Sequence, residues 1–276
     1  MPGTVEISRV NDVESQSDET RLKRYIRCLE GRYFPAMTIL LVLVQFCFFV
    51  ANCAKHDDGD ECLDPSESFD EYFSHWMWWT LGCRDHDKRL QFYRYGSSAV
   101  SHYGVTHLIP NLVITLVLGI DMELFHGPWR VLCVWVVSHC VGLWTYSGLT
   151  NLFGPNSIRK LVGSSGAAYG LMGCRVSNIA LNFDTMPRQE ALTRILLVVL
   201  FLAADVYTYA ADRSSSVAYL AHWGGAAGGL LAGFAVFRNY VVQEGETIAS
   251  FVLLAILAPA CVIVAIATYL PKPVPC

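Results

Sequence analysis

The sequence is poor in charged residues and has no excess of basic ones. Lys, Arg, Asp and Glu together make up only 16% of the 276 residues, whereas hydrophobic residues make up 53%. Soluble domains carry about 25% charged residues, so an ordinary soluble enzyme is excluded. The net charge of −4 provides no broad basic face, so a nucleic-acid partner is excluded as well.

Metal-binding and disulfide-scaffold patterns are also missing. The ten cysteines are scattered without a Cys-x-x-Cys pair, which argues against a zinc ribbon or a small disulfide scaffold. No His-Glu-x-x-His sequence occurs, and we expect neither a metal nor a cofactor. Cys53, Cys62 and Cys83 lie in or near the first long loop, and whether any of them forms a disulfide stays open.

Long apolar segments are what the sequence does contain. Residues 34–54 and 248–270 include no Asp, Glu, Lys, Arg or His, and each is long enough for a helix across the hydrocarbon core, which takes about 20 residues. Five further candidates lie between them, at 104–120, 131–149, 161–181, 195–209 and 217–237. Because backbone groups in lipid must bond within their own segment, we expect an all-α polytopic membrane protein with seven transmembrane helices.

Charges beside the first apolar segment predict the orientation of the chain. Basic residues precede this segment, and the loop after it is rich in acidic residues. Since basic flanks stay in the cytosol, we expect residues 1–33 to form a polar cytosolic tail. Residues 34–270 then form the transmembrane domain, with one long outer loop at 55–101, and residues 271–276 form a short lumenal tail.

Two motifs of small residues carry polar side chains within the apolar segments. Ser165 lies among glycines at 163–170, and His222 precedes a glycine-rich stretch that ends at 229. Small residues also serve close helix packing, and a lone membrane histidine is commonly a structural hydrogen-bonder. However, with the two helices entering near Lys160 and Val217, both side chains lie five positions inside, about 7–8 Å below the same surface. A serine becomes a nucleophile when a histidine takes its proton, so the matched depth favours a catalytic pair.

A third polar group lies in the segment 104–120. His107 and Asn111 are four residues apart and share one helix face, whereas His102 is expected to point elsewhere. Side-chain donors of this kind suit the oxyanion that forms in acyl transfer. A polar clamp between helices would use the same residues, and a single histidine on the face is a poor ligand set for zinc.

Taken together, these motifs resemble the rhomboid family of intramembrane serine proteases. The resemblance rests on Gly-x-Ser-Gly at 163–166, Ala-His-x-x-Gly at 221–225, His-x4-His-x3-Asn at 102–111, Tyr93-Arg94, Gly119, Glu123, Gly127 and Arg130. It covers residues 90–237, a six-helix core. A seventh helix follows this core, and the resulting arrangement is similar to that of the eukaryotic secretase-type subclass, which includes insect members of the family.

The resemblance implies a role for each matching residue. Ser165 would be the nucleophile and His222 the general base of a dyad, with no acidic third member. His107, Asn111 and the backbone N–H of Ser165 would form the oxyanion hole, and Tyr169 would pack on the His222 ring. The supporting positions near the site would be Gly163, Gly166 and Gly225. Arg94 would anchor the outer loop, and Glu123 and Arg130 would be supporting residues near the end of the second helix. Residues 210–217 would form part of a gate for substrate entry.

A few residues depart from the family pattern or lie outside it. Tyr93 stands where the family usually has Trp, and Ser164 is unusual beside the nucleophile. Ser164 lies about 100° around the helix from Ser165 and is not expected to replace it. Arg175 is expected to snorkel to the cytosolic interface. Asp205, near the outer end of its segment, is assigned no part in the site.

The resulting prediction is a serine endopeptidase that acts within the lipid bilayer. It would cleave single-pass transmembrane substrates near the outer end of their helix and release ectodomains, for example of growth-factor-like precursors. The subclass suggests the Golgi, the secretory pathway or the plasma membrane. One alternative is a catalytically inactive rhomboid-like protein that binds membrane clients to control their trafficking or degradation. Another is a seven-helix receptor or transporter, although a transporter favours charges at the midplane of broken helices.

Overall fold

The computed structural model describes residues 20, 33–54, 78–79, 91–153, 160–183, 185–211, 218–237 and 244–270. Within these residues the long helices are α2 (Ala36–Cys53), α5 (Val105–His126), α6 (Pro128–Phe153), α7 (Ser165–Asn182), α8 (Arg188–Ala211), α9 (Tyr219–Val236) and α10 (Glu244–Tyr269). All seven expected apolar segments are therefore helical. Most of the cytosolic tail, most of the outer loop and the lumenal tail lie outside the described residues.

Two short elements accompany the long helices. The eight-residue helix α4 (Tyr93–Val100) precedes α5. The strands β1 (Trp78–Trp79) and β2 (Lys160–Leu161) form a two-stranded antiparallel pair in which Trp78 faces Leu161. This pair joins the outer loop to the residues just before α7, so the outer loop is held close to the start of that helix.

Some helices extend past the apolar segments that predicted them. The helix α5 runs to His126, six residues beyond the expected end, and α8 begins seven residues before the expected start. Both extensions carry charged or polar side chains that bond to neighbouring helices within the bundle, for example Glu123 and Arg194. Hydropathy alone marks only the lipid-compatible part of such helices, which is why the predicted ends were too short.

By length and hydropathy, five of the long helices could span a membrane, whereas α7 and α9 are not apolar enough. The helices α2, α5, α6 and α8, together with residues 251–269 of α10, are long and apolar enough to cross a bilayer. The helices α7 and α9 are the richest in glycine of the long helices and have buried side chains along their length. The protein is a polytopic integral membrane protein whose two glycine-rich helices lie inside the bundle.

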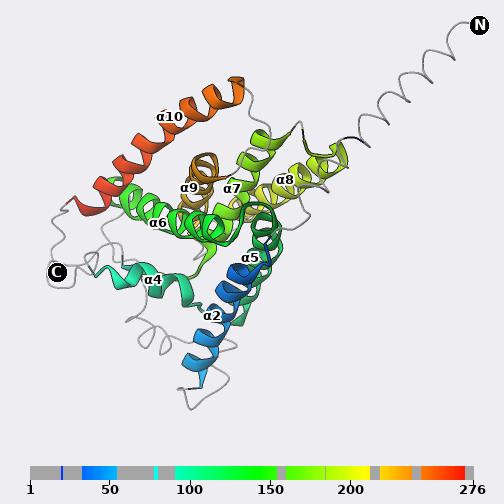
Figure 1. Ribbon diagram of the computed structural model, residues 1–276. Helices are drawn as coiled ribbons and strands as arrows, with labels where there is room; N and C mark the ends of the chain where they lie inside the picture. Colours follow the sequence, from blue (N-terminus) through cyan, green and yellow to red (C-terminus); the bar gives the residue numbers. More distant parts are fainter. Residues whose placement is uncertain are drawn as a thin grey trace, which may run out of the picture.

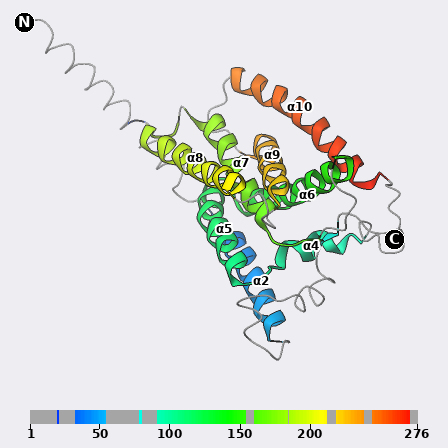
Figure 2. The ribbon, with the colours of Figure 1, turned by 180° about the vertical axis from the view of Figure 1, so that it is seen from behind.

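The helices are arranged around α7 and α9 (Figure 1). These two make the most extensive contact in the bundle, and α6 packs across both of them. The helix α10 packs on α6, while α2 and α5 lie side by side on the opposite flank, as the reverse view also shows (Figure 2). The helix α8 contacts α7 over a small area and buries only Ala191, Arg194, Val198 and Asp205.

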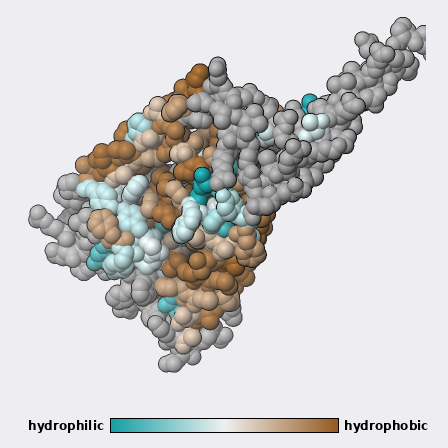
Figure 3. Space-filling model, viewed as in Figure 1, coloured by the Kyte–Doolittle hydropathy of each residue, from teal (hydrophilic) through white to brown (hydrophobic). Residues whose placement is uncertain are grey.

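The outer surface of the bundle is apolar where a bilayer would surround it. Figure 3 shows continuous hydrophobic surface over α10 and over α2 and α5. The exposed side chains there include Phe251, Ile256 and Ile263 of α10 and Leu40 and Leu43 of α2. Hydrophobic patches of this size are rare on soluble monomers and mark contact with lipid or protein. The surface therefore agrees with the polytopic fold class.

Glycine allows the central helices to touch through their backbones. A methyl group built at Gly225 of α9 would lie 2.0 Å from the carbonyl oxygen of Gly166 in α7. No side chain fits at that separation, and close approach of this kind is a common basis of helix association in membranes. The α7–α9 contact therefore depends on the absence of a side chain at Gly225.

We expect Gly225→Ala to destabilise the protein by about 2 kcal/mol, because the added methyl forces the two backbones apart. Thermal unfolding of the purified protein in detergent measures this loss. The matched control is Gly96→Ala in α4, where an added methyl has nothing within 4 Å. That variant should be as stable as the wild type, since alanine is the better helix former. Equal melting temperatures for the two variants would contradict the packing argument.

Candidate active site

The nucleophile candidate Ser165 is the first residue of α7. The first bond of this helix is donated by the N–H of Ala168 to the carbonyl oxygen of Ser164, at 2.9 Å. The N–H groups of residues 165–167 therefore have no partner within the helix. Since such groups also lie at the positive end of the helix dipole, the start of α7 favours negative charge beside Ser165.

The turn before Ser165 requires glycine. Gly163 has a φ of +108°, and a methyl group there would lie 2.6 Å from Cε1 of His107. Its N–H donates to the carbonyl oxygen of Ser98 at 2.9 Å, which ties the turn to α4. Both the backbone conformation and the nearby imidazole exclude a side chain at this position. The His107 ring consequently lies directly against the turn that leads into Ser165.

The neighbouring serine points away from the site. Ser164 is fully buried, and its hydroxyl donates to Oε1 of Gln45 in α2 at 2.6 Å. It also lies 3.3 Å from Nε2 of His102. Ser164 therefore holds the turn against α2, in agreement with the expectation that it does not replace Ser165.

His102 lies beside His107, which the sequence did not predict. The two rings meet edge to face with centroids 5.4 Å apart, so the expectation that His102 points elsewhere was wrong. The difference arises because residues 101–104 precede α5, and helical spacing does not apply to them. Burial lowers the pKa of His102 to about 3, which leaves the ring neutral behind the turn.

His107 and Asn111 occupy one face of α5, as their spacing predicted. The backbone N–H of Tyr103 donates to Nδ1 of His107 at 3.4 Å, which assigns the ring proton to Nε2. The buried Asn111 amide donates one N–H to the carbonyl oxygen of His107 at 2.8 Å. The second Asn111 N–H is not used by this bond. Each side chain thus has an N–H to offer, and the His107 ring lies beside the turn before α7.

The base candidate His222 is buried in the first turn of α9 and held on two sides. The Tyr169 ring stacks on it, with centroids 4.1 Å apart and planes 14° apart. Its Nδ1 lies 3.1 Å from Oδ1 of Asp205 in α8. A carboxylate only accepts, so Nδ1 donates and the lone pair is on Nε2. Nε2 is the nitrogen that a general base needs unprotonated.

The helix contact brings Ser165 and His222 to neighbouring turns. Gly166, next to Ser165, packs against Ala221 and Gly225, which flank His222 in sequence. Within the described residues no hydrogen bond joins the Ser165 hydroxyl to His222. In hydrolases of this kind the bond between nucleophile and base commonly shortens when substrate binds.

Asp205 is the site residue that the sequence analysis missed. It accepts bonds from the side chains of Tyr169, His222 and Trp223, although it had been assigned no part in the site. A signal was present, because Asp205 is the only charged residue in the segment 195–209. A charged side chain within a membrane helix is costly and commonly has a specific partner.

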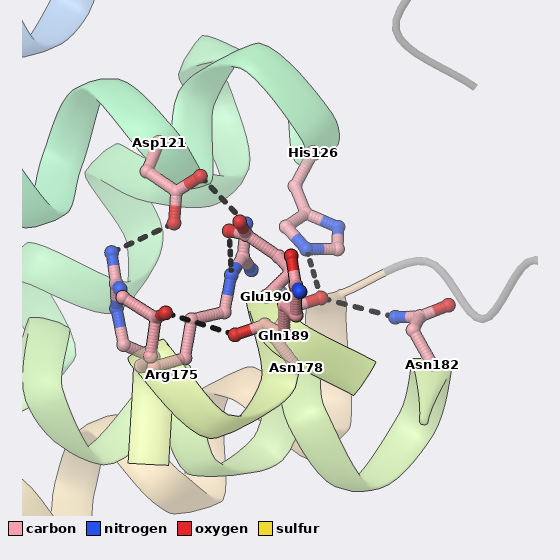
Figure 4. A network of polar contacts seen from close by, with 9 residues as sticks. Asp121, His126, Arg175, Asn178, Asn182, Gln189 and Glu190 are labelled. Atoms are coloured by element: carbon pink, nitrogen blue, oxygen red, sulfur yellow. Dashed lines mark hydrogen bonds and ion pairs between the residues drawn. The ribbon is translucent and has the colours of Figure 1, made fainter. Parts of the chain in front are cut away.

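A second polar network lies at the other end of the bundle (Figure 4). Asp121 of α5 pairs with Arg175 of α7 and Arg194 of α8, both at 2.7 Å, and Arg194 also pairs with Glu190. Arg175 is only 4% exposed, so the expectation that it snorkels was wrong. It is paired because Asp121 lies within reach on α5. Arg175 lies ten residues, about 15 Å, along α7 from Ser165, and this distance separates the network from the candidate site.

Two of the predicted supporting residues connect elements of the bundle, and a third bonds within its own segment. Glu123 accepts the N–H groups of Met37 and Thr38, at 2.9 and 2.7 Å, where α2 begins. Arg130 of α6 donates to the carbonyl oxygen of Val236 at the end of α9, at 2.7 Å. Arg94 of α4 is buried and donates to Gln91 at 2.6 Å. None of the three approaches Ser165 through these bonds, so each acts on the scaffold.

Other expectations fall at the edge of the described residues. Ala210 and Ala211 end α8, and the rest of the expected gate, 212–217, lies outside the described part. Cys53 is disulfide-bonded to a partner outside that part. Cys62 and Cys83 also lie outside the described residues. Among the residues described, no group of three potential ligands could hold a metal ion.

We expect Glu123→Gln to lower the stability of the protein by about 2 kcal/mol. The change removes the charge from a fully buried carboxylate that accepts bonds at a helix N-terminus, and charge-assisted bonds are the stronger kind. Thermal unfolding in detergent measures the effect. Glu190→Gln is the matched control, because its pair with Arg194 is more exposed and of the i,i+4 type, worth about 0.5 kcal/mol. A loss for Glu190→Gln as large as for Glu123→Gln would contradict the assignment.

Comparison with known proteins identifies the domain that contains these residues. The family model described as the rhomboid domain matches residues 89–239. Rhomboid-related protein 1 of Caenorhabditis elegans is 33% identical over 169 residues, which cover 60% of this chain and 46% of that protein. Rhomboid-related protein 2 of Mus musculus is 32% identical over 160 residues, which cover 56% of this chain and 51% of that protein.

A third relative is described by its name as inactive. Inactive rhomboid-related protein 2 of Caenorhabditis elegans is 27% identical over 247 residues, covering 86% of this chain and 63% of that protein. The chain spans about half the length of the first two relatives. The matched domain includes the turn before α7, the start of α9 and the polar face of α5, and it takes up more than half of the sequence. The chain belongs to the rhomboid family.

Proposed function

We propose that this protein is an intramembrane serine protease with Ser165 as nucleophile and His222 as general base. The observation that supports it most is the state of His222, whose Nδ1–H is bonded to Asp205 and whose Nε2 is left as the basic nitrogen. The packing of Gly166 against Ala221 and Gly225 supports the pairing with Ser165. A structural histidine in a helix contact needs neither feature.

The proposed reaction is acyl transfer to Ser165 followed by hydrolysis. His222 Nε2 takes the hydroxyl proton as Ser165 Oγ attacks the substrate carbonyl, and the imidazolium then gives that proton to the leaving amine. The oxyanion is stabilised by the Ser165 N–H, by His107 Nε2–H and by the second N–H of Asn111. A water molecule, deprotonated by His222, then releases the acyl product and restores the Ser165 hydroxyl.

The proposed substrates are single-pass transmembrane proteins. The site lies near the ends of α7 and α9 that face the outer loop, so a substrate helix would have to unwind near its outer end to expose a carbonyl. Cleavage there releases an ectodomain, as from a growth-factor-like precursor. With a cytosolic N-terminus the products are shed into the lumen of the secretory pathway or outside the cell.

The second candidate function is that of an inactive member that binds membrane clients and controls their trafficking or degradation. It is favoured by the long match to a relative whose name calls it inactive. The presence of both Ser165 and His222 in this chain supports the protease instead. Reaction with a serine-directed probe separates the two functions.

A fluorophosphonate probe should label the wild-type protein in detergent and fail to label Ser165→Ala. The matched control is Ser164→Ala, which removes the adjacent hydroxyl that is bonded to Gln45 and should retain labelling. Gel fluorescence of the purified variants, together with cleavage of a transmembrane substrate, measures the outcome. Equal labelling of the wild type and Ser165→Ala would reject the nucleophile, and an unlabelled wild type would favour the inactive alternative.

Proteolysis should decline on acidification, because His222 accepts a proton only in its neutral form. The measurement is kcat/KM for a transmembrane substrate across about pH 5 to 8. Thermal unfolding at each pH serves as the control for loss of the folded state. A flat profile over this range would count against His222 as the base.

A further inference from the structure

Asp205 carries a buried carboxylate that three side chains of the candidate site surround. Oδ1 accepts the Tyr169 hydroxyl at 2.7 Å and lies 3.1 Å from His222 Nδ1. Oδ2 accepts Nε1–H of Trp223 at 3.0 Å. The Asp205 side chain is 4% exposed. Both oxygens therefore act as acceptors, which is the pattern of an ionised carboxylate with a defined orientation.

Tyr169, Tyr219 and Asp205 define where the His222 ring lies. Tyr169 stacks on one face of the imidazole while its hydroxyl reaches the carboxylate. Tyr219 approaches the ring edge-on, with centroids 6.0 Å apart. A rotation of the imidazole about its side-chain bonds would break both the stacking and the bond to Asp205. The carboxylate thus selects one ring orientation and one tautomer.

We propose that Asp205 is a positioning residue for His222, which makes the dyad implied by the resemblance a triad in this chain. The inference rests on the proposed protease function and concerns how its base works. Asp205 keeps the proton on Nδ1 and leaves Nε2 to accept the proton of Ser165. It also stabilises the imidazolium that forms when that proton is transferred, without taking the proton itself.

A purely structural role is the alternative that the experiment must separate. Asp205 is one of only four buried residues of α8, so it also ties this helix to the bundle. A second charged contact of α8 is the Arg194–Asp121 pair, near the opposite end of this helix. Asp205→Asn and Asp121→Asn are therefore matched changes. Each replaces a carboxylate by its amide and weakens one polar contact that holds α8 in the bundle. Only Asp205→Asn removes a carboxylate that contacts His222.

The test compares a small probe with a full substrate for both variants in detergent. Inactivation by a fluorophosphonate requires the base but no entry of a helical substrate. Asp205→Asn should lower kcat and the maximal inactivation rate at least about tenfold, with KM and the probe's half-saturation changed less than about twofold. Asp121→Asn should keep the inactivation rate of the wild type, even where it alters substrate turnover.

The possible results are distinct. If the probe inactivates Asp205→Asn at the wild-type rate, the positioning role is overturned. It is also overturned if the inactivation rates of both variants fall by the same factor. An unreactive wild type would instead overturn the proposed function itself. If Asp205→Asn does not fold, the wild type still provides the test by nuclear magnetic resonance of ¹⁵N-histidine-labelled protein. The expected result is a Nδ1–H signal that disappears in His222→Gln, and its absence would overturn the proposal.

Discussion

Backbone contact between α7 and α9 is the constraint on which the candidate site depends. The two helices approach so closely that the Gly166 carbonyl occupies the space of a side chain at Gly225. This contact sets Ser165, at the start of one helix, beside the turn of the other that carries His222. It also brings the Tyr169 ring onto the imidazole. A bulkier pair of helices would separate these groups by several ångströms and leave each one a solitary polar residue in an apolar bundle.

The helix α8 is related to the site in a different way. Between Arg194 and Asp205 it exposes apolar side chains such as Leu196, Val199 and Leu200 and buries little else. The polar contacts of Arg194 and Asp205, near opposite ends of α8, therefore contribute to its place in the bundle beside this limited packing. Because one of these contacts is the bond to His222 Nδ1, the orientation of the imidazole is linked to the position of α8. A displacement of that end of α8 would remove the carboxylate from the ring.

The apolar segments predicted the helices well but not where they end. The apolar segments located all seven long helices, and five of these helices are long and apolar enough to cross a bilayer. They failed at the extensions of α5 and α8, because polar residues there bond to other helices rather than to water. Arg175 was misjudged for the same reason. Its partner Asp121 lies 54 residues away in the sequence, on a different helix.

The sequence by itself determined the residue types of the candidate site and their depth. Gly163, Ser165, His107, Asn111 and His222 were identified from motifs and spacing, because helical periodicity converts position along the chain into position along a helix. The tertiary structure decided how those residues are oriented. It showed which edge of the His222 ring faces a carboxylate, that His102 lies against His107, and that Ser164 faces α2. These relations join helices that are remote in sequence, and periodicity within one helix carries no information about the neighbour against which each face will pack.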